Sequence, residues 1–541
     1  MRRTGIMAAL ALTLVACGPP ADQDLTVGTL ERDRIEIQAE SWETLVEQGM
    51  DFEAALELVS ASNVFTTHTP VPAGHDIFDK HLMKEYFVDC LDRMKMDFDE
   101  FMQLGSSPNA EHSFNMTALA LRGSRFHNGV SRIHGSVASD MESYVWPEIP
   151  YHENPITYVT NGVHAPTFLA REWINLFDMR FSVWRNQLLN RSYWKRIDDI
   201  PDHRFWSLRQ ELKAQMLENM HALTMSRYKK NQANDALIKR ITSIIGNPEA
   251  DVLVLGFARR FATYKRATLL FKDAERLARL LNDPERPVVL MFAGKAHPND
   301  EPGQDLIRTI HNYAHRPEFQ GKIILLEDYN MAMARSLVTG VDVWINTPQY
   351  PLEACGTSGM KAAINGVINL SVLDGWWAEA WDGKNGWAIT PHPEFDPQTR
   401  EQLEAEELLN ILEYQVIPTY YARNEDGEPE AWITTSKASM KSVLPRFNTI
   451  RMAKDYLREQ GIEHGGIAAI GQMHPDAAGG GDPRRRQLGG HAAGRKLVAL
   501  APGQGGHTLE RIFFHDLLNT AGGPATGAAA QAVPVLAPIS L

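Results

Sequence analysis

The stretch DVLVLGFARRFATYKR, Asp251–Arg266, joins a run of apolar, β-forming residues directly to a cluster of cations. A continuous apolar run of this length is typical of a strand that is buried on both faces. The same succession recurs downstream, with helical runs between the strands, in PVVLMFAG (287–294), KIILLED (322–328), VDVWINT (341–347) and GVINLSVL (366–373). We therefore predict a doubly wound α/β domain with a parallel sheet over about residues 251–389.

Unusual polar residues follow the predicted strands. The segments that carry them are ARRFATYKR (258–266), AGKAHPND (293–300), EDYN (327–330) and NTPQYPLEACGTSG (346–359). Ligands of doubly wound sheets bind at the carboxyl ends of the strands. The sequence therefore predicts a ligand-binding cleft at this edge of the sheet.

The cations of the first segment are Arg259, Arg260, Lys265 and Arg266. Guanidinium groups bind phosphate oxygens bidentately and a lysine adds a point charge, so such a group of cations can hold two phosphates side by side. The alternative is a solvated loop with ordinary charge. The position of the cluster in the same predicted cleft as Lys361 favours phosphate binding.

Lys361 is isolated in the nearly uncharged stretch EACGTSGMKAAINGVINLSVLDGWW, Glu353–Trp377. It lies about one turn into a helix predicted to begin near Gly356, and the free N–H groups of such a helix start favour an anion. An apolar setting also favours the neutral amine, which can condense with an aldehyde. Pyridoxal 5′-phosphate would use both features. The alternative is a lysine that extends its ammonium into the cleft.

The whole chain has 541 residues, 44% of them hydrophobic and 22% charged, with a formal net charge of −13. This composition excludes disorder throughout, and the negative charge argues against nucleic acid or an anionic membrane as the main partner. Three widely spaced cysteines provide neither a disulfide framework nor a zinc site. We expect no metal site, and we interpret His68 and His75 as part of a cleft-wall turn.

The two ends of the chain differ from its body. Residues 1–20 have the layout of a bacterial lipoprotein signal that ends at Cys17, and the alternative is a start codon read through upstream of a truncated gene. Residues 471–541 are rich in Gly, Ala, Pro and Arg, and we expect them to be largely unpacked. Between the ends we predict a partial N-terminal lobe at 48–247 and a cofactor-binding lobe with crossing helices at 248–460.

Several of these segments together resemble the short bacterial form of α-glucan phosphorylase. The resemblance rests on the Lys361 stretch and on GFARRFATYKRATLL, HTPVPAGHD, HNGVSRIHG and VTNGVHAPTF, and it covers about residues 48–460. It implies the GT-B fold of two doubly wound, Rossmann-like lobes, with the N-terminal lobe incomplete in this chain. It also implies that orthophosphate cleaves a terminal α-1,4 link of glycogen or maltodextrin and releases glucose 1-phosphate with retained configuration.

The resemblance assigns pyridoxal 5′-phosphate as the cofactor and Lys361 as the lysine that carries it. The backbone of Thr357 and Ser358 matches the cradle of the cofactor phosphate. Arg259 would face that phosphate, and Tyr329 matches a tyrosine near the cofactor. The family implies a cytoplasmic enzyme; an envelope lipoprotein anchored through Cys17 is the alternative, and a homo-oligomer stays open.

The substrate side is assigned in the same way. Arg260 and Lys265 would hold orthophosphate beside the cofactor phosphate, and both count with Lys361 as catalytic residues. The residues that match contacts to sugar hydroxyls are Asn161, Glu353, Cys355 and Gly356. In the family, the cofactor phosphate exchanges a proton with orthophosphate, which protonates the glycosidic oxygen.

The sequence also departs from the family pattern. Cys355 stands where Ser is usual, Ser136 where Glu is common, Asn330 where an acidic residue is usual and Phe168 where Trp is usual. No GGLG-like segment lies upstream of His68. We therefore expect little or no phosphorylase activity from the chain as written.

Two other functions remain open at this stage. One is a nucleotide-sugar glucosyltransferase of the same two-lobed shape, similar to glycogen synthase, which needs no covalent lysine. The other is a non-catalytic phosphorylase remnant that keeps a cofactor-binding lobe, tethered to a membrane only if Cys17 is lipidated.

Overall fold

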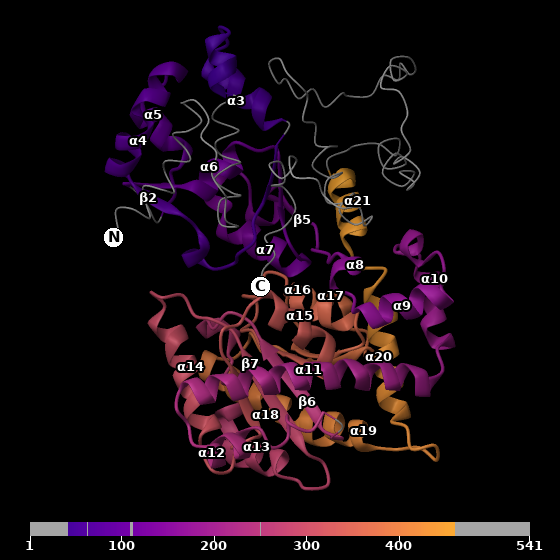
Figure 1. Cartoon of the computed structure of the whole chain (residues 1–541). Coiled ribbons are helices and arrows are strands. Elements are labelled where there is room, and N and C mark those ends of the chain that lie inside the picture. Colours follow the sequence, from indigo (N-terminus) through magenta and orange to yellow (C-terminus); the bar gives the residue numbers. More distant parts are fainter. Residues whose placement is uncertain (1–41, 62, 109–111, 249, 460–541) are drawn as a thin grey trace. The chain divides into compact units, whose positions relative to one another are not determined.

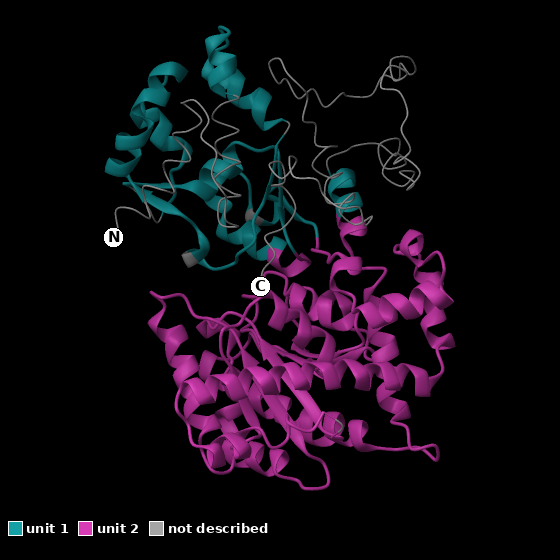
Figure 2. Ribbon diagram, in the orientation of Figure 1, with its two compact units in different colours: residues 1–130, 135–159, 453–538 teal, residues 131–134, 160–452, 539–541 magenta. Residues whose placement is uncertain are grey.

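The computed structural model describes residues 42–61, 63–108, 112–248 and 250–459 (Figure 1). Their contacts divide the chain into two units (Figure 2). Unit 1 takes the described parts of 1–130, 135–159 and 453–538, and unit 2 takes 131–134 and 160–452. Helices α7 (Arg132–Met141) and α21 (Thr449–Glu459) contribute residues to both units.

Unit 2 is built on a parallel sheet, which in the described residues has six strands. Their order is β11-β10-β9-β6-β7-β8, and every neighbouring pair is parallel. The strands are β6 (Leu253–Ala258), β7 (Val288–Ala293), β8 (Ile323–Leu326), β9 (Val343–Asn346), β10 (Ile368–Val372) and β11 (Gly386–Ile389). The first five are the strands predicted from the sequence, and their parallel pairing confirms the predicted mixed α/β class.

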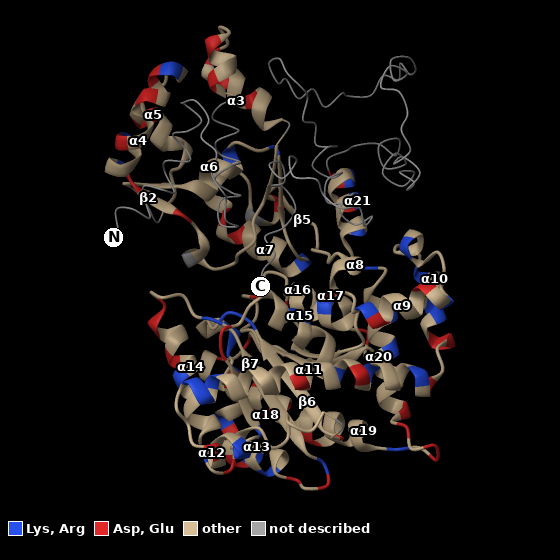
Figure 3. Ribbon diagram, viewed as in Figure 1, with Lys and Arg blue, Asp and Glu red and all other residues tan. Residues whose placement is uncertain are grey.

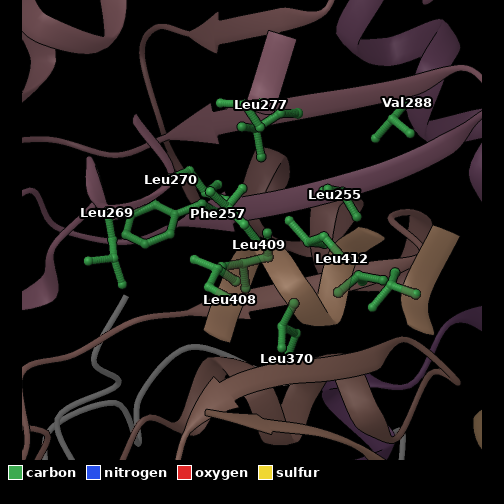
Figure 4. Packing of buried hydrophobic residues seen from close by; sticks show 14 of the residues in the cluster. Leu255, Phe257, Leu269, Leu270, Leu277, Val288, Leu370, Leu408, Leu409 and Leu412 are labelled. Atoms are coloured by element: carbon green, nitrogen blue, oxygen red, sulfur yellow. The ribbon is translucent and has the colours of Figure 1, made fainter. Parts of the chain in front are cut away.

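Both faces of this sheet are covered. Every residue of β6 and β7 is buried. Leu255 and Phe257 of β6 belong to one hydrophobic cluster, together with Leu408 of a following helix (Figure 4), whereas Val254 and Ala258 belong to another. Because successive side chains of a strand point to opposite faces, the two clusters are two separate cores. This explains why the strand sequences are continuously apolar.

Helices connect the strands, and several begin where their sequences predict. Asp273, Asp300 and Asp396 accept backbone N–H groups at the first turns of α13, α14 and α18, and the last two helices also have proline in the first turn. The helices around the sheet, these three included, are α11 (Asp202–Lys230), α13 (Ala274–Leu281), α14 (Glu301–Ala314), α15 (Met331–Gly340), α16 (Thr357–Ala363), α17 (Trp377–Ala380), α18 (Pro397–Ile411), α19 (Ile417–Tyr421) and α20 (Glu430–Val443).

The described part of unit 1 has a three-stranded parallel sheet and a separate antiparallel pair. The parallel sheet has the order β1-β4-β5, and β2 pairs with β3. The elements are α3 (Phe52–Ser60), β1 (Val64–Thr66), β2 (Ile77–Asp79), α4 (Lys80–Met94), α5 (Phe98–Leu104), β3 (Ser113–Asn115), α6 (Met116–Arg122), β4 (Phe126–Gly129) and β5 (Ile156–Tyr158). Within this unit, His75 is bonded through Nδ1 to the Thr117 hydroxyl at 2.8 Å.

Residues 160–247 group with unit 2, whereas the sequence prediction divided the chain near residue 247. The reason lies in α11, which packs on α15. Met216 and Leu217 of α11 share a core with Leu337 and Val341. A Cβ on Gly340 would lie 2.2 Å from the Cβ of Met216, so only glycine permits this contact. The long helix is therefore part of one face of the larger sheet.

The ends of the chain lie outside the described residues, and so do the predicted signal segment at 1–20 and tail at 471–541. Among the helices that the structure describes, none is long and apolar enough to span a membrane.

Candidate functional site

The carboxyl ends of the parallel strands meet at one edge of the sheet in unit 2. Strand β6 lies between β7 and β9, so the chain first extends the sheet on one side of β6 and later on the other. Such a switch point opens a crevice at the carboxyl ends of the strands. The predicted site residues other than Asn161 all follow β6, β8 or β9 at this edge. Among these loops, Lys and Arg are concentrated in the one after β6, at residues 259–266, and basic segments near β7 are blue in Figure 3.

Arg259, directly after β6, lies at the centre of a buried ion-pair cluster. Its Nη2 donates to both carboxylate oxygens of Glu353, at 2.7 and 2.8 Å, and its Nη1 donates to Oδ1 of Asn346. Asn346 is the last residue of β9 and donates in turn to the Ser371 hydroxyl of β10 at 3.3 Å. Arg259 and Asn346 together thus join the ends of three neighbouring strands, β6, β9 and β10.

Lys265 is the second cation of this cluster. Its Nζ lies 3.5 Å from Oε2 of Glu353. Burial opposes the charge of Glu353, but Arg259 and Lys265 outweigh it and keep the pKa of the carboxyl below its usual value. Burial, followed by the charge of Arg259, lowers the pKa of Lys265 to about 7, although Glu353 acts in the opposite direction. Lys265 can therefore gain or lose a proton near neutral pH.

The other two cations of the segment behave differently from each other. Arg260 is exposed, and within the described part of the chain it makes no hydrogen bond or ion pair, so its guanidinium is available to a ligand. Arg266 points into the protein: it pairs with buried Glu404 of α18 and donates to the carbonyls of Thr347 at 3.0 Å and Pro348 at 2.7 Å. Arg266 therefore holds the β9 loop and is not a free phosphate ligand.

Lys361 lies in α16, a helix of seven residues that starts after Gly356 at a φ of 88°. The side chain is 8% exposed, and burial lowers its pKa to about 8. Its Nζ lies 4.4 Å from the centroid of the Phe168 ring. Among the described residues this amine has no hydrogen bond and no ion pair, which is rare for a buried lysine. The predicted helix start and apolar setting of Lys361 are both present.

The residues predicted to cradle a phosphate begin the same helix. Thr357 and Ser358 are its first two residues, and the Ser358 hydroxyl accepts a hydrogen bond from Nε1 of Trp344 at 3.2 Å. The first turn of α16 is thus tied to β9 through a side chain. The Ser358 backbone N–H, which is the group that the prediction uses, is not involved in that bond.

The residues predicted to contact sugar are also brought together. The backbone N–H of Asn161 is bonded to the sulfur of Cys355, and burial raises the pKa of that thiol. The Asn161 carbonyl accepts from Nη2 of Arg451 at 2.8 Å. Asn161 and Cys355 are 6% and 4% exposed, so both lie in the interior of unit 2.

Tyr329 follows β8 and packs against the core that includes α15. Burial raises its pKa to about 12, and the charge of Arg259 acts in the opposite direction, which places the two side chains within electrostatic range. Asn330, where the family pattern has an acidic residue, caps α15 by accepting from the N–H groups of Ala332 and Met333.

Sequence reasoning missed Asp374, which follows β10. Its carboxylate accepts from the backbone N–H of Glu353 at 2.9 Å and from that of Gly375 at 2.7 Å. It is 1% exposed, and burial, with Glu353 nearby, raises its pKa to about 7. An acidic residue directly after a predicted buried strand, in LSVLDGWW, was the signal that could have found it.

Comparison with known proteins gives a consistent result. A family model described as carbohydrate phosphorylase matches residues 37–382. The maltodextrin phosphorylase of Thermococcus litoralis is 43% identical over 420 residues, which is 76% of this chain and 48% of the relative. The glycogen phosphorylase of Aquifex aeolicus is 41% identical over 418 residues, 77% of this chain and 59% of the relative. The glycogen phosphorylase of Mycobacterium tuberculosis is 39% identical over 422 residues, which is 77% of this chain and 48% of the relative. The chain spans about half the length of the curated relatives it matches.

Proposed function

The chain belongs to the carbohydrate phosphorylase family, and from this premise we propose that it acts in the cleavage of α-1,4-glucans by orthophosphate. The product is glucose 1-phosphate. The names of the relatives, which are glycogen and maltodextrin phosphorylases, support this substrate class. The observation that carries the proposal is Lys361, a buried amine with a pKa lowered to about 8 and, among the described residues, no polar partner.

We propose pyridoxal 5′-phosphate as the cofactor, and the chemistry of the residues present fits it. Lys361 offers an amine that is partly neutral at physiological pH, as covalent attachment to an aldehyde requires. The Nε of Arg259 is buried and has no hydrogen-bond acceptor in the described part of the chain, so this donor is available to an anion. Thr357, Ser358 and Arg259 would hold the cofactor phosphate, with Tyr329 nearby. When bound, the cofactor supplies a phosphate that exchanges a proton with orthophosphate.

On the substrate side, Arg260 and Lys265 would hold orthophosphate. Arg260 is exposed and unpaired within the described residues, and Lys265 is paired only loosely with Glu353, at 3.5 Å. Fixed cations at this position balance the charge of two adjacent phosphates without reorganisation during the reaction. Asn161, Glu353, Cys355 and Gly356 would bind the hydroxyls of the departing glucose. Proton transfer from orthophosphate to the glycosidic oxygen is general acid catalysis.

We further propose that units 1 and 2 are parts of the two lobes of a GT-B fold. The strand order of unit 2, β11-β10-β9-β6-β7-β8, supports a Rossmann-like cofactor lobe. The parallel order β1-β4-β5 supports a related lobe in unit 1. The switch point of unit 2 then provides the cofactor site.

The first test is covalent trapping. Protein loaded with pyridoxal 5′-phosphate is reduced with borohydride and digested, and mass spectrometry should find the pyridoxyl group on Lys361. Lys361→Ala should lose it, whereas Lys295→Ala, at the carboxyl end of β7, should retain it. Trapping elsewhere or not at all would contradict the cofactor assignment and favour nucleotide-sugar transfer.

The second test is turnover. The protein is incubated with maltodextrin and orthophosphate, and glucose 1-phosphate is measured by a coupled enzyme assay. Phosphate-dependent release that Lys361→Ala abolishes supports the proposal. Cofactor trapping without any release would support the non-catalytic remnant instead.

A further inference from the structure

We propose that Asp374 is a positioning residue that fixes the loop carrying Glu353 and Cys355, and through it the sugar side of the site. The proposal rests on the function proposed above for these residues. Asp374 itself touches neither of the side chains that would contact sugar. It accepts the backbone N–H of Glu353, from the end of the neighbouring strand β10.

The carboxylate of Asp374 joins two segments of the chain. One oxygen, Oδ2, accepts the N–H of Glu353, and the other, Oδ1, accepts the N–H of Gly375. Asp374 is 1% exposed, so water cannot replace either bond. A buried N–H without an acceptor is costly, and the loop therefore has little freedom to leave this position.

The residues after Asp374 hold the same loop at a second point. The backbone N–H of Trp376 donates to the carbonyl of Cys355 at 2.9 Å. Gly375 has a φ of 51°, and a Cβ on it would lie 2.4 Å from that carbonyl oxygen. The two backbones are thus in direct contact, which only glycine allows. Asp374 and Trp376 together fix both ends of the segment Glu353–Cys355.

This attachment determines where the Glu353 carboxylate lies. Both of its oxygens accept from Arg259, and one lies near Lys265. If the Glu353 backbone moved, its carboxylate would leave Arg259, and Cys355 would leave the N–H of Asn161. The start of α16 has an attachment of its own, from Ser358 to Trp344. Loss of Asp374 should therefore disturb sugar contacts more than the hold on the cofactor.

The structural test uses Cys355 and Cys90, both of which are buried in the described part of the chain. Asp374→Asn replaces one acceptor oxygen, and Asp374→Ala removes both. The rate of maleimide labelling of Cys355, followed by peptide mass spectrometry, should rise about tenfold or more in Asp374→Ala and less in Asp374→Asn. Labelling of Cys90, which lies in unit 1, should stay unchanged.

A matched control separates local release from general loss of stability in unit 2. Asn385→Ala removes a buried amide from another turn of unit 2. Its Oδ1 accepts the N–H of Asp382 at 3.2 Å, and its Nδ2 donates to the Ala380 carbonyl at 2.9 Å and the Ser442 hydroxyl at 3.1 Å. This variant should not accelerate labelling of Cys355. Equal acceleration in Asn385→Ala and Asp374→Ala, or none in Asp374→Ala, would overturn the proposal.

The functional test uses two ligands on cofactor-loaded protein, with binding measured by calorimetry. The Kd for glucose, a neutral sugar, should rise about tenfold in Asp374→Asn, whereas the Kd for orthophosphate and the bound pyridoxal content should change much less. Equal weakening of both ligands would overturn the assignment to the sugar side. If wild-type protein binds neither ligand while the labelling difference holds, the proposed function fails and the fixing of this loop by Asp374 stands.

Discussion

Replacement of Lys361 by methionine should stabilise the cofactor-free protein. The change keeps an unbranched side chain of similar length and removes the buried ammonium. Lys361 is 8% exposed, and its Nζ faces the ring of Phe168. Among the described residues it has no carboxylate partner. A buried ammonium without a partner lowers the stability of the folded state. Residues that cost stability in this way are expected at reactive sites, where function requires them.

The magnitude follows from the pKa of Lys361, which burial lowers from 10.5 to about 8. Each pKa unit corresponds to about 1.4 kcal/mol, so the ammonium costs up to about 3 kcal/mol in the folded state. Contact of the ammonium with an aromatic ring stabilises the folded state by about 0.5–2 kcal/mol. We therefore expect Lys361→Met to raise the free energy of unfolding by about 1–3 kcal/mol at pH 7, which is large against a usual stability of about 5–15 kcal/mol.

The pH dependence has a definite sign. The amine is protonated up to about pH 10.5 in the unfolded chain and only up to about pH 8 in the folded one. Between these values the unfolded state binds more protons, so the stability of wild type rises with pH relative to the variant. The advantage of Lys361→Met should be complete below about pH 8 and should disappear toward pH 10.5.

The assay is urea unfolding of cofactor-free protein, followed by tryptophan fluorescence at several pH values between 7 and 10. Lys384→Met, which changes an exposed lysine, serves as the control and should alter stability little at any pH. Two results would contradict the prediction: a Lys361→Met variant less stable than wild type at pH 7, or a difference in stability that does not depend on pH. Either would show that the buried ammonium does not lower the free energy of unfolding.

Three further changes test other parts of unit 2. Arg260→Ala should weaken orthophosphate binding by about 1.5–3 kcal/mol, the value of a charge-assisted contact, and should leave pyridoxal content unchanged, as calorimetry and absorbance would show. Lys213→Met should lower the free energy of unfolding by about 3–5 kcal/mol because it leaves Asp342 buried without its cation, and the double variant with Asp342→Leu should recover part of the loss in urea unfolding. Asn330→Ala removes the cap of α15 and should lower the melting temperature by an amount equivalent to about 1 kcal/mol, measured by calorimetry.

The sheet of unit 2 could be predicted from the sequence because its strands are buried on both faces. Residues such as Val288–Ala293 are continuously apolar, and this pattern together with intervening helices is specific to parallel sheets. The grouping of α11 with that sheet could not be predicted. It depends on the contact of Met216 with Gly340, which are more than a hundred positions apart in the sequence. The amphipathic pattern of a helix predicts that one face is buried, but not which element packs on that face.

The candidate site was predictable only in part, for a related reason. Motifs mark the positions of Arg259, Lys265 and Lys361, but they do not say which cations are already paired. In the structure, Arg266 is bonded to Glu404 and to carbonyls of the β9 loop. Arg259 is bonded to both Glu353 and Asn346. Asp374 was overlooked because its role is to accept backbone N–H groups, and such bonds leave no pattern of side-chain types in the sequence.

The two ends of the sheet in unit 2 hold two buried lysines, Lys213 and Lys361, in different surroundings. At the amino ends of β6 and β9, Lys213 is 1% exposed and its Nζ donates to the carbonyl of Val252, the carboxylate of Asp342 and the hydroxyl of Tyr420. All three donors of that ammonium are satisfied, as folding alone requires. At the carboxyl ends, Lys361 is 8% exposed, and within the described residues it has no such partner. The fold therefore surrounds Lys213 with partners, as it pairs Lys265 with Glu353, but it leaves Lys361 without one among the described residues. The unsatisfied end is the one where a bound group would supply the missing interactions, and this contrast supports the proposed cofactor site independently of any sequence motif.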